Sequence, residues 1–288
     1  IFYKIVQGVL ILEVSLKDIS SYIDFLITKN GLYVTLHGAF VCVPELVKYN
    51  CHFNPYCCFV KTATSNWETC IKNQEKVLKK CEAGEFFGTC HAGVGEFVYP
   101  ISTDGKVLGF ISVSGYRNGD TSKQKSLHFA RKNGVSRETA DNMRSRYLNG
   151  VIPSKESLDA VIHPLLFMLV SYLKKGERFS ANAELDLYTK LFNYITAYHN
   201  TRITMKELSG KFNCSVSSLS HLFKKRSGMS ISEYIEKLRL DEAKWLLSQS
   251  RYTVTEVSDC LGFCNSGYFS SVFKRKFGIS PKDYRKNF

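Results

Sequence analysis

Residues 222–234 read LFKKRSGMSISEY, and residues 272–284 read VFKRKFGISPKDY. The two segments lie 50 positions apart, repeat the same Phe, Gly, Ser and Tyr, and each place a basic triplet directly after the Phe. Repetition at a fixed period indicates a duplicated structural unit. We therefore interpret the two segments as equivalent parts of one repeated module.

Each repeat closes a pair of short helices joined by a turn. The first pair is predicted from TMKELSGKF at 204–212 and SVSSLSHLFKKR at 215–226, and the second from TVTEVSDCL at 253–261 and NSGYFSSVFKRK at 265–276. The first helix of each pair starts at a Thr, which is a common N-cap, and ends in a turn that contains Asn or Gly. A second helix that is polar early and basic late is typical of helix-turn-helix units. The sequence therefore predicts an all-α domain at residues 181–288 that binds double-stranded DNA through two such units.

The whole chain is basic. Its 288 residues carry 39 Lys and Arg against 26 Asp and Glu, which gives a net charge of +13 at pH 7. This excess favours a polyanionic partner, although many basic proteins simply carry solvated lysines. A chain of this length is expected to form two domains.

Several classes of protein are excluded by what the sequence lacks. No apolar run reaches the ~18 residues that a membrane-spanning helix needs. We find no P-loop, nucleophile elbow or HExxH motif, and no convincing pair of carboxylates. We therefore expect a cytoplasmic protein that is not an enzyme and does not cross a membrane.

Cysteine is concentrated in the first third of the chain. Seven of the ten cysteines precede residue 91: Cys42, Cys51, Cys57, Cys58, Cys70, Cys81 and Cys90. With no secretion signal and a DNA-binding end, the compartment is expected to be reducing, so disulfides are not the default. Cys57 (or Cys58), Cys70 and Cys90, together with His91, are candidate zinc ligands, because zinc prefers thiolate and imidazole. The alternatives are that these cysteines pack as small apolar side chains or that they sense oxidation.

Residues 1–117 combine helix and strand patterns. Apolar spacing predicts a helix at 16–30, strand material at 31–43 and a helix at 66–82. Two β-rich segments follow in 86–116, separated by the turn sequence Thr103-Asp104-Gly105. This order predicts a compact α+β sensor module.

Residues 118–180 read as a helical coupler that ends in a linker, with breaks at Gly134, Gly150 and Pro153. The last helical pattern, at 157–175, is apolar nearly all round. Such a helix must be covered either by its own domain or by a second copy of the chain in a homodimer. The sequence leaves both alternatives open.

The N-terminal module carries a series of short motifs in a fixed order: Asn54-Pro55-Tyr56-Cys57, Trp67 to Cys70, Cys90-His91-Ala92-Gly93, Pro100-Ile101 and Leu108 to Phe110. In these motifs the region 16–117 resembles the PocR-type sensory domain. The resemblance implies a variant of the PAS-like fold that binds small hydrocarbon derivatives such as diols.

Three residues are the candidate contacts for such a ligand: His91, Glu96 and Tyr99. They lie among aromatic residues that could line a pocket, and a pocket of this kind commonly holds a few polar groups. The alternative is that His91 is an ordinary packed or surface histidine and that the aromatic residues form the core.

The C-terminal module resembles the AraC/XylS family of transcription regulators over residues 187–287. The resemblance rests on the run LFKKRSGMSISEYI, the segments Arg239 to Ala243 and Val257 to Phe263, and the closing SPKDYR. Beside this resemblance, we expect the helix at 234–247 to join the two units as a rigid strut. If it holds both recognition helices on one face, they can enter successive major grooves.

The positions that match the family's base-facing residues are Ser217, Ser220 and His221 in the first unit and Ser266, Gly267, Ser270 and Ser271 in the second. Serine pairs with several base edges, so specificity is expected to depend on DNA shape or on His221. The cations late in the two helices are expected to contact phosphates: Lys224, Lys225, Lys274 and Arg275.

We therefore expect a ligand-responsive transcription regulator, most simply an activator, with an N-terminal small-molecule sensor and a C-terminal DNA reader. Its expected partners are promoter DNA, RNA polymerase, a small organic effector and a second copy of the chain. The alternative function is a metal- or redox-responsive regulator that uses the cysteine cluster.

Overall fold

The computed structural model describes residues 2–6, 9–38, 43, 45–46, 49–50, 52, 54–62, 67–175, 187–200, 203–249 and 252–287. The chain divides into two compact units, which are described one at a time. The first consists of Ile1–Tyr56 and Thr69–Ala183, and the second of Cys57–Glu68 and Glu184–Phe288. The sheet and the helices of residues 119–175 therefore lie in the same unit.

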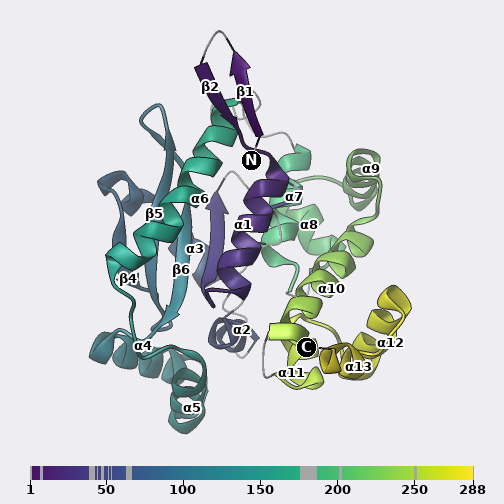
Figure 1. The fold of residues 1–288 in the computed structure, drawn as a ribbon. Coiled ribbons are helices and arrows are strands. Elements are labelled where there is room, and N and C mark those ends of the chain that lie inside the picture. The colour runs from purple at the N-terminus through teal and green to yellow at the C-terminus, as the bar shows by residue number, and fades with distance from the viewer. Residues whose placement is uncertain are drawn as a thin grey trace. The chain divides into compact units, whose positions relative to one another are not determined.

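The first unit is built on a four-stranded antiparallel sheet of order β3-β6-β5-β4 (Figure 1). Its strands are β3 (Tyr33–Gly38), β4 (Phe86–Thr89), β5 (Gly95–Thr103) and β6 (Lys106–Tyr116). A separate antiparallel hairpin pairs β1 (Phe2–Val6) with β2 (Val9–Glu13). The helices before residue 176 are α1 (Leu16–Thr28), α2 (Pro55–Thr62), α3 (Trp67–Lys80), the short 3-10 helix η3 (Cys81–Ala83), α4 (Gly119–Lys132), α5 (Arg137–Tyr147) and α6 (Lys155–Lys175).

The turn predicted at 103–105 joins β5 to β6. Thr103 pairs with Lys106, and between them Asp104 and Gly105 have φ values of 50° and 74°. Two consecutive residues in the left-handed region are what a tight type I′ hairpin turn requires. The predicted hairpin is confirmed.

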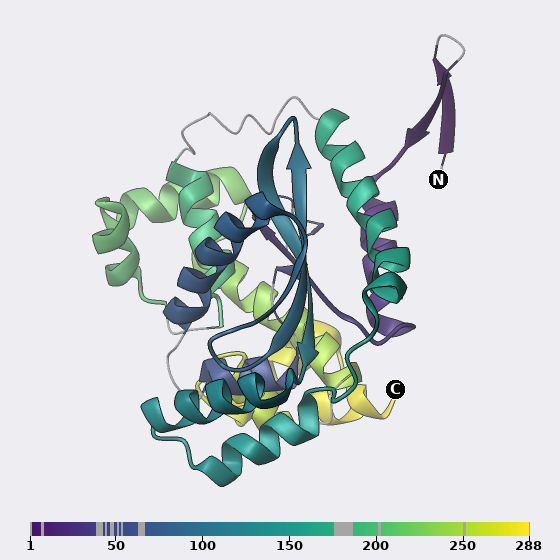
Figure 2. The same ribbon diagram turned by 90° about the vertical axis from the view of Figure 1, so that its left-hand side faces the viewer.

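The two faces of the sheet differ in chemistry. One face is apolar and carries the buried side chains of Val34, Leu36, Phe97, Tyr99, Ile101, Ile111 and Val113. Figure 2 shows α1 and α6 on this side of the sheet and α3 on the other. On the side of α3, Val98 and Phe110 pack with Cys81 against Val77 and Leu78. The same face also carries a set of buried polar residues, described below.

A capping box fixes the residue at which helix α1 begins. Ser15 and Asp18 form a capping box, in which each side chain accepts a hydrogen bond from the other residue's backbone N–H. Two orphan N–H groups are satisfied in this way. The Tyr22 hydroxyl then donates to the carbonyl of Val161 at 3.0 Å, which ties α1 to α6.

Helix α6 contains Pro164 and is strongly apolar. Among the described residues, one helix is long and apolar enough to cross a membrane, judged by length and composition alone, and it is α6 over Lys155–Lys174. Its inward side is buried within the unit: Leu158, Ile162, Leu165 and Leu169. A core helix of a globular domain has such a side. This packing supports the intramolecular alternative, although Phe167 on the opposite side is 58% exposed.

The second unit is helical in its described residues after Glu184. Its helices are α7 (Leu187–Tyr198), α8 (Met205–Phe212), α9 (Val216–Ser227), α10 (Ile231–Gln249), α11 (Val254–Cys260), α12 (Ser266–Phe277) and α13 (Pro281–Lys286). The predicted fold class, an α+β module followed by an all-α domain with two helix-turn-helix units, is confirmed.

The repeated residues play equivalent structural roles. Phe223 packs on Tyr234 with ring centroids 5.4 Å apart, and Phe273 packs on Tyr284 at the same distance. Both Phe side chains are fully buried. The duplicated Phe is therefore in the core of each repeat, and the duplicated Tyr packs against it.

Candidate functional site

Local capping fixes the first helix-turn-helix unit. Thr204 and Glu207 form a capping box at the start of α8, and Asn213 ends the helix with a φ of 49°. Asn tolerates this left-handed conformation better than most residues. Ser215 then accepts from the N–H of Ser218 at 3.1 Å and starts α9. The turn thus sets the direction of α9 relative to α8.

The second helix-turn-helix unit has the same arrangement of caps and turn, formed by different residues. Thr253 and Glu256 form the capping box of α11, and Asn265 starts α12 by accepting from the N–H of Tyr268 at 2.7 Å. Gly262 has a φ of 69°, and a Cβ there would lie 2.3 Å from the carbonyl oxygen of Asn200. Only glycine fits this turn without a shift of backbone.

The predicted base-facing residues lie on the accessible sides of α9 and α12. The exposed ones are Ser217, Ser220, His221, Gly267 and Ser271, and the half-buried ones are Ser266 and Ser270. On the opposite side of each helix, Leu219 of α9 and Phe269 of α12 are fully buried at equivalent positions of the repeat. Each second helix therefore buries one side and presents a polar side.

The serine hydroxyls on these helices already donate within the helix. Ser220 Oγ donates to the carbonyl of Val216 at 2.8 Å, and Ser270 Oγ donates to that of Ser266 at 2.7 Å. A hydroxyl that donates keeps lone pairs as acceptors. In this state the serines can accept from the amino groups of adenine or cytosine, which is weak discrimination.

Basic residues fill the last turn of both helices. Lys224, Lys225 and Lys274 are exposed, as the prediction for phosphate contact requires. Arg275 is also exposed, but its Nη2 lies 3.2 Å from Oε1 of Glu236 on α10. Sequence reasoning passed over Arg226 and Lys276, which complete the two basic triplets and are exposed as well.

A buried polar network joins α7 to the strut α10. His199 Nε2 lies 3.0 Å from Oε2 of Glu242, and Asn200 Nδ2 donates to the same oxygen at 2.7 Å. Arg239 Nε donates to the carbonyl of His199 at 2.7 Å. A buried carboxylate is stable only when donors surround it. The network thus fixes the end of α7 against the strut α10.

In the first unit, the buried polar residues form a band on the face of the sheet that lies toward α3. The members are Thr35 and His37 on β3, Glu96 on β5, and Ser112 and Ser114 on β6. The strand register pairs Glu96 with Ser114 and Thr35 with Ser112, so all five share one face. We call this set the polar band.

The groups of the polar band are hydrogen-bonded only in part. Ser112 Oγ donates to Glu96 Oε2 at 2.9 Å, and His37 Nε2 lies 3.1 Å from His52 Nε2. Ser114 Oγ is buried without a hydrogen-bond partner among the described residues. Buried polar atoms normally have partners, so the Ser114 hydroxyl is a position where a water molecule or a hydrogen-bonding ligand can bind.

Burial also perturbs the acids near the band. It raises the pKa of the Glu96 carboxyl, against the opposing effects of the Ser112 hydrogen bond and Lys125. Burial, aided by Glu96, raises the pKa of Cys90 to about 12 and that of Cys81 to about 11. These two thiols are therefore protonated at pH 7, and a protonated thiol is a weak nucleophile.

The Cys90-His91-Ala92-Gly93 motif forms a tight turn between β4 and β5. Gly93 has a φ of 87°, and a Cβ there would lie 2.3 Å from the carbonyl oxygen of Ser122 on α4. The hydroxyl of Tyr56 donates to the carbonyl of Ala92 at 3.0 Å. The turn is therefore held from two sides, and it positions His91.

His91 points toward α3 and is half-buried. Its Nδ1 lies 2.7 Å from Nδ2 of Asn73, and its Nε2 lies 3.9 Å from Sγ of Cys70. Burial, followed by the charges of Lys125 and Lys132, lowers the pKa of His91, so the ring is neutral at pH 7.

The three predicted ligand residues do not share one face of the sheet. Glu96 belongs to the polar band, whereas Tyr99 lies on the apolar face and donates its hydroxyl proton to Asp159 of α6 at 3.0 Å. Sequence reasoning missed Thr35, His37, Ser112 and Ser114. Their signal was the alternation of polar and apolar residues in TLH at 35–37 and SVS at 112–114.

The predicted zinc ligands Cys57, Cys70 and Cys90 are distributed over both units. Cys57 is buried in the second unit, and Cys70 and Cys90 belong to the first. In the part of the chain that the structure describes, one group of at least three metal-ligating side chains has all its donor atoms within 4.8 Å of one another: Glu85, Asp159 and His163. The cysteine site stays a prediction.

Two family models match the chain. The model described as a sensory domain found in PocR matches residues 33–177, half of the 288 residues, and a helix-turn-helix domain model matches residues 208–287. The first match includes helices α4 to α6 as well as the sheet.

Curated relatives match a part of the chain. The HTH-type transcriptional activator RhaR of Yersinia pseudotuberculosis serotype O:1b is 45% identical over 71 residues, which are 25% of this chain and 24% of RhaR. The uncharacterized HTH-type transcriptional regulator YdiP of Escherichia coli (strain K12) is 37% identical over 95 residues, 33% of this chain and 31% of YdiP. The chain thus spans less than a third of the length of these relatives.

Solved structures match a similar share of the chain. The C-terminal domain of the two-component response regulator yesN from Fusobacterium nucleatum is 32% identical, with a TM-score of 0.32, and the match covers 33% of this chain and 94% of that domain. The DNA-binding domain of AdpA in complex with a target DNA is 22% identical, with a TM-score of 0.34, over 36% of this chain and 93% of that domain.

Proposed function

Because this chain belongs to the family with the PocR-type sensory domain and carries an AraC-type helix-turn-helix domain, we propose that it is a transcription regulator whose promoter binding responds to a small organic effector. The observation that supports the DNA-binding part best is the duplicated geometry of α9 and α12. Both helices bury an equivalent apolar side, expose a polar side and end in a basic triplet.

Selection of bound duplexes from a random library tests the two-unit reading. The full chain should recover two half-sites with centres about 10 base pairs apart, because each recognition helix enters one major groove. Substitution of His221 by Ala should relax preference in one half-site, and Ser271→Ala should act on the other. Lys224→Ala should weaken binding to all sequences alike, since phosphates carry no sequence information. Recovery of a single half-site of one module's length would contradict the proposal.

The polar band supports a hydroxylated effector, such as a small diol. Ser114 offers an unsatisfied hydroxyl, and Glu96 is a buried carboxyl whose raised pKa allows it either to donate or to accept. A diol presents two donors and two acceptors at short spacing, so it can satisfy both groups at once.

Fluorescence anisotropy with the selected duplex tests this effector class. A diol of two to four carbons should change the Kd for DNA, and Glu96→Gln together with Ser114→Ala should remove the response while DNA binding without diol is kept. A matched control is Ser171→Ala on α6, which removes a hydroxyl outside the polar band. Equal DNA affinity with and without every diol tested would contradict the effector class but not the DNA-binding role.

We propose further that the protein activates transcription through RNA polymerase and acts as a homodimer. The name of the similar protein RhaR supports activation. Two large apolar side chains on α1 and α6 support self-association, since Phe25 is 48% exposed and Phe167 is 58% exposed. Sedimentation of the wild type and the Phe167→Ser variant tests the dimer, and a monomeric wild type at micromolar concentration would refute it.

A further inference from the structure

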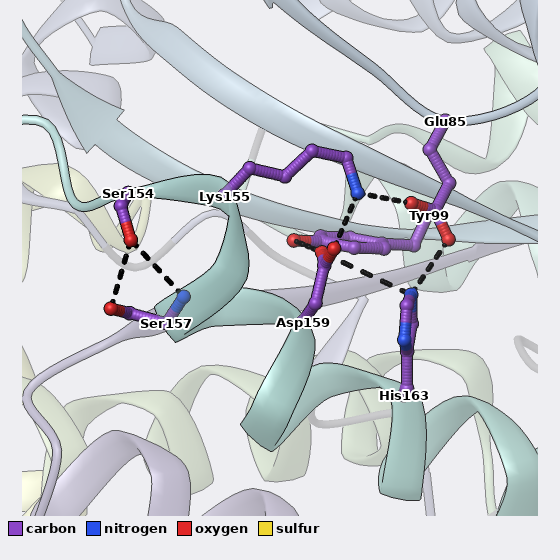
Figure 3. A network of polar contacts seen from close by, with 7 residues as sticks. All are labelled: Glu85, Tyr99, Ser154, Lys155, Ser157, Asp159 and His163. Atoms are coloured by element: carbon purple, nitrogen blue, oxygen red, sulfur yellow. Dashed lines mark hydrogen bonds and ion pairs between the residues drawn. The ribbon is translucent and has the colours of Figure 1, made fainter.

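A second cluster of titratable groups lies at the far side of the sheet from the polar band. Glu85 precedes β4, Tyr99 lies on β5, and Lys155, Asp159 and His163 lie on the first three turns of α6 (Figure 3). Ser154 starts this helix by accepting from the N–H of Ser157 at 3.2 Å. The cap fixes where α6 begins, and the contacts of Lys155 and His163 with Glu85 show that these residues lie on the side of the helix toward Glu85.

The donor atoms of this cluster match the spacing of metal ligands. His163 Nε2 lies 2.9 Å from Glu85 Oε1 and 3.9 Å from Asp159 Oδ1, and the ligand atoms of the three residues all lie within 4.8 Å of one another. Bonds of 2.0–2.1 Å at tetrahedral angles place ligand atoms about 3.3 Å apart. The observed separations lie on either side of that value, so small rotations of the side chains suffice to form the site.

The net charge of the cluster is compatible with a bound divalent cation. Lys155 Nζ now bridges the two carboxylates, 2.6 Å from Glu85 Oε2 and 2.7 Å from Asp159 Oδ2. Two carboxylates and one ammonium sum to −1 while His163 is neutral. If a divalent ion takes the place of Lys155, the sum becomes 0, and Lys155, already 47% exposed, can turn to solvent.

The surroundings hold the ligands in place. The Tyr99 hydroxyl donates to Asp159 Oδ1 at 3.0 Å, and its ring packs edge-on against His163 with centroids 5.9 Å apart. Hydrogen bonds from outside the ligand set orient carboxylates in metal sites. Asp159 and His163 are also one helical turn apart, so they project from the same side of α6.

We propose that Glu85, Asp159 and His163 bind a divalent first-row metal ion, such as Mn²⁺ or Zn²⁺, in competition with the Lys155 ammonium. His163 would bind through Nε2, with its proton on Nδ1, and water would complete the coordination. The ion would hold the start of β4 to α6, which is the last described helix of the sensor unit. This site is distinct from the predicted cysteine ligands and from the polar band.

Mn²⁺ titration of the full chain, followed by the electron paramagnetic resonance signal of the free ion, tests the proposal. Mn²⁺ is the better probe because cysteine thiolates prefer softer ions such as Zn²⁺. One ion per chain is expected. Lys155→Met should tighten binding by about tenfold, since it removes the competing ammonium. His163→Gln and Asp159→Asn should each weaken it by about tenfold or more.

Matched controls separate this site from general charge effects. Lys123→Met removes an exposed positive charge from α4, and His128→Gln removes an exposed imidazole from the same helix. Neither should change the affinity. The Lys155→Met variant tests the site even if loss of a ligand unfolds the sensor. Absence of Mn²⁺ binding by the wild type and by Lys155→Met, or binding that is unchanged in His163→Gln, would overturn the proposal.

Discussion

Replacement of Glu236 by Gln is expected to strengthen DNA binding, because it releases Arg275. In the structure Arg275 Nη2 lies 3.2 Å from Glu236 Oε1, and the two side chains are 69% and 34% exposed. An ion pair in such a solvated position contributes about 0.2–1 kcal/mol. Arg275 must break this ion pair to reach a phosphate. Removal of the ion pair by Glu236→Gln should therefore lower the Kd for DNA by about 1.4- to 5-fold. The loss of a negative charge near the phosphates acts in the same direction.

The assay is fluorescence anisotropy with one duplex at fixed ionic strength, arranged as a double-mutant cycle. The gain from Glu236→Gln should be smaller in the Arg275→Ala background, because the released group is then absent and only the effect of the lost negative charge remains. Asp259→Asn on α11 is the control, since it removes an exposed carboxylate from the same domain. An equal gain in the presence and absence of Arg275 would show that only net charge matters, and it would refute the competition between Glu236 and phosphate.

Three further predictions concern stability. Gly93→Ala should destabilise the first unit by about 1–3 kcal/mol, measured by thermal unfolding, because of its positive φ and its contact with Ser122. Phe223→Ala should cost the second unit about 3–5 kcal/mol in chemical denaturation, since the ring is fully buried. Burial raises the pKa of Glu96, so the folded state binds its proton more tightly than the unfolded chain does. The free energy of unfolding should therefore fall as pH rises from 4.5 towards the raised pKa, and Glu96→Gln should flatten that dependence.

The sequence was most informative where local signals repeat. Both repeats contain the same local signals: a Thr that caps the first helix, a Gly that ends the second helix, and a buried Phe. The caps are Thr204 and Thr253, and the glycines are Gly228 and Gly278. Gly228 and Gly278 both have the left-handed conformation that commonly ends a helix, with φ values of 77° and 80°. A pattern that depends on residues within one turn of each other can be read without knowledge of tertiary contacts.

Helix α2 was not predicted, although its start carries a clear signal. Asn54 Oδ1 accepts from the N–H of Tyr56 at 2.9 Å, and Pro55 occupies the first helical position, where its missing N–H costs nothing. The segment is short and rich in cysteine, so apolar spacing alone does not distinguish a helix from a strand. The capping residue would have decided the matter.

The candidate effector residues were harder to predict because they depend on strand register. His91 and Glu96 were selected from a motif and its neighbourhood, but the band around Glu96 is completed by residues of β3 and β6. A side chain's face is fixed only when its partner strand is known. Tyr99 illustrates the limit, since it is three residues from Glu96 and lies on the opposite face.

Because Glu96 and Tyr99 lie on opposite faces of the sheet, strand β5 contacts both the polar band and α6. The strand carries Glu96 to the polar band on one face and Tyr99 to Asp159 of α6 on the other. A ligand that changes the hydrogen bonds of Glu96 therefore acts on the same rigid strand that holds the first turns of α6. Strands in a packed sheet do not deform independently on their two faces, because the interior is close-packed. We infer that an effector at the polar band and an ion at Glu85, Asp159 and His163 would act on one element from opposite sides, and that the two signals would reach α6 through β5.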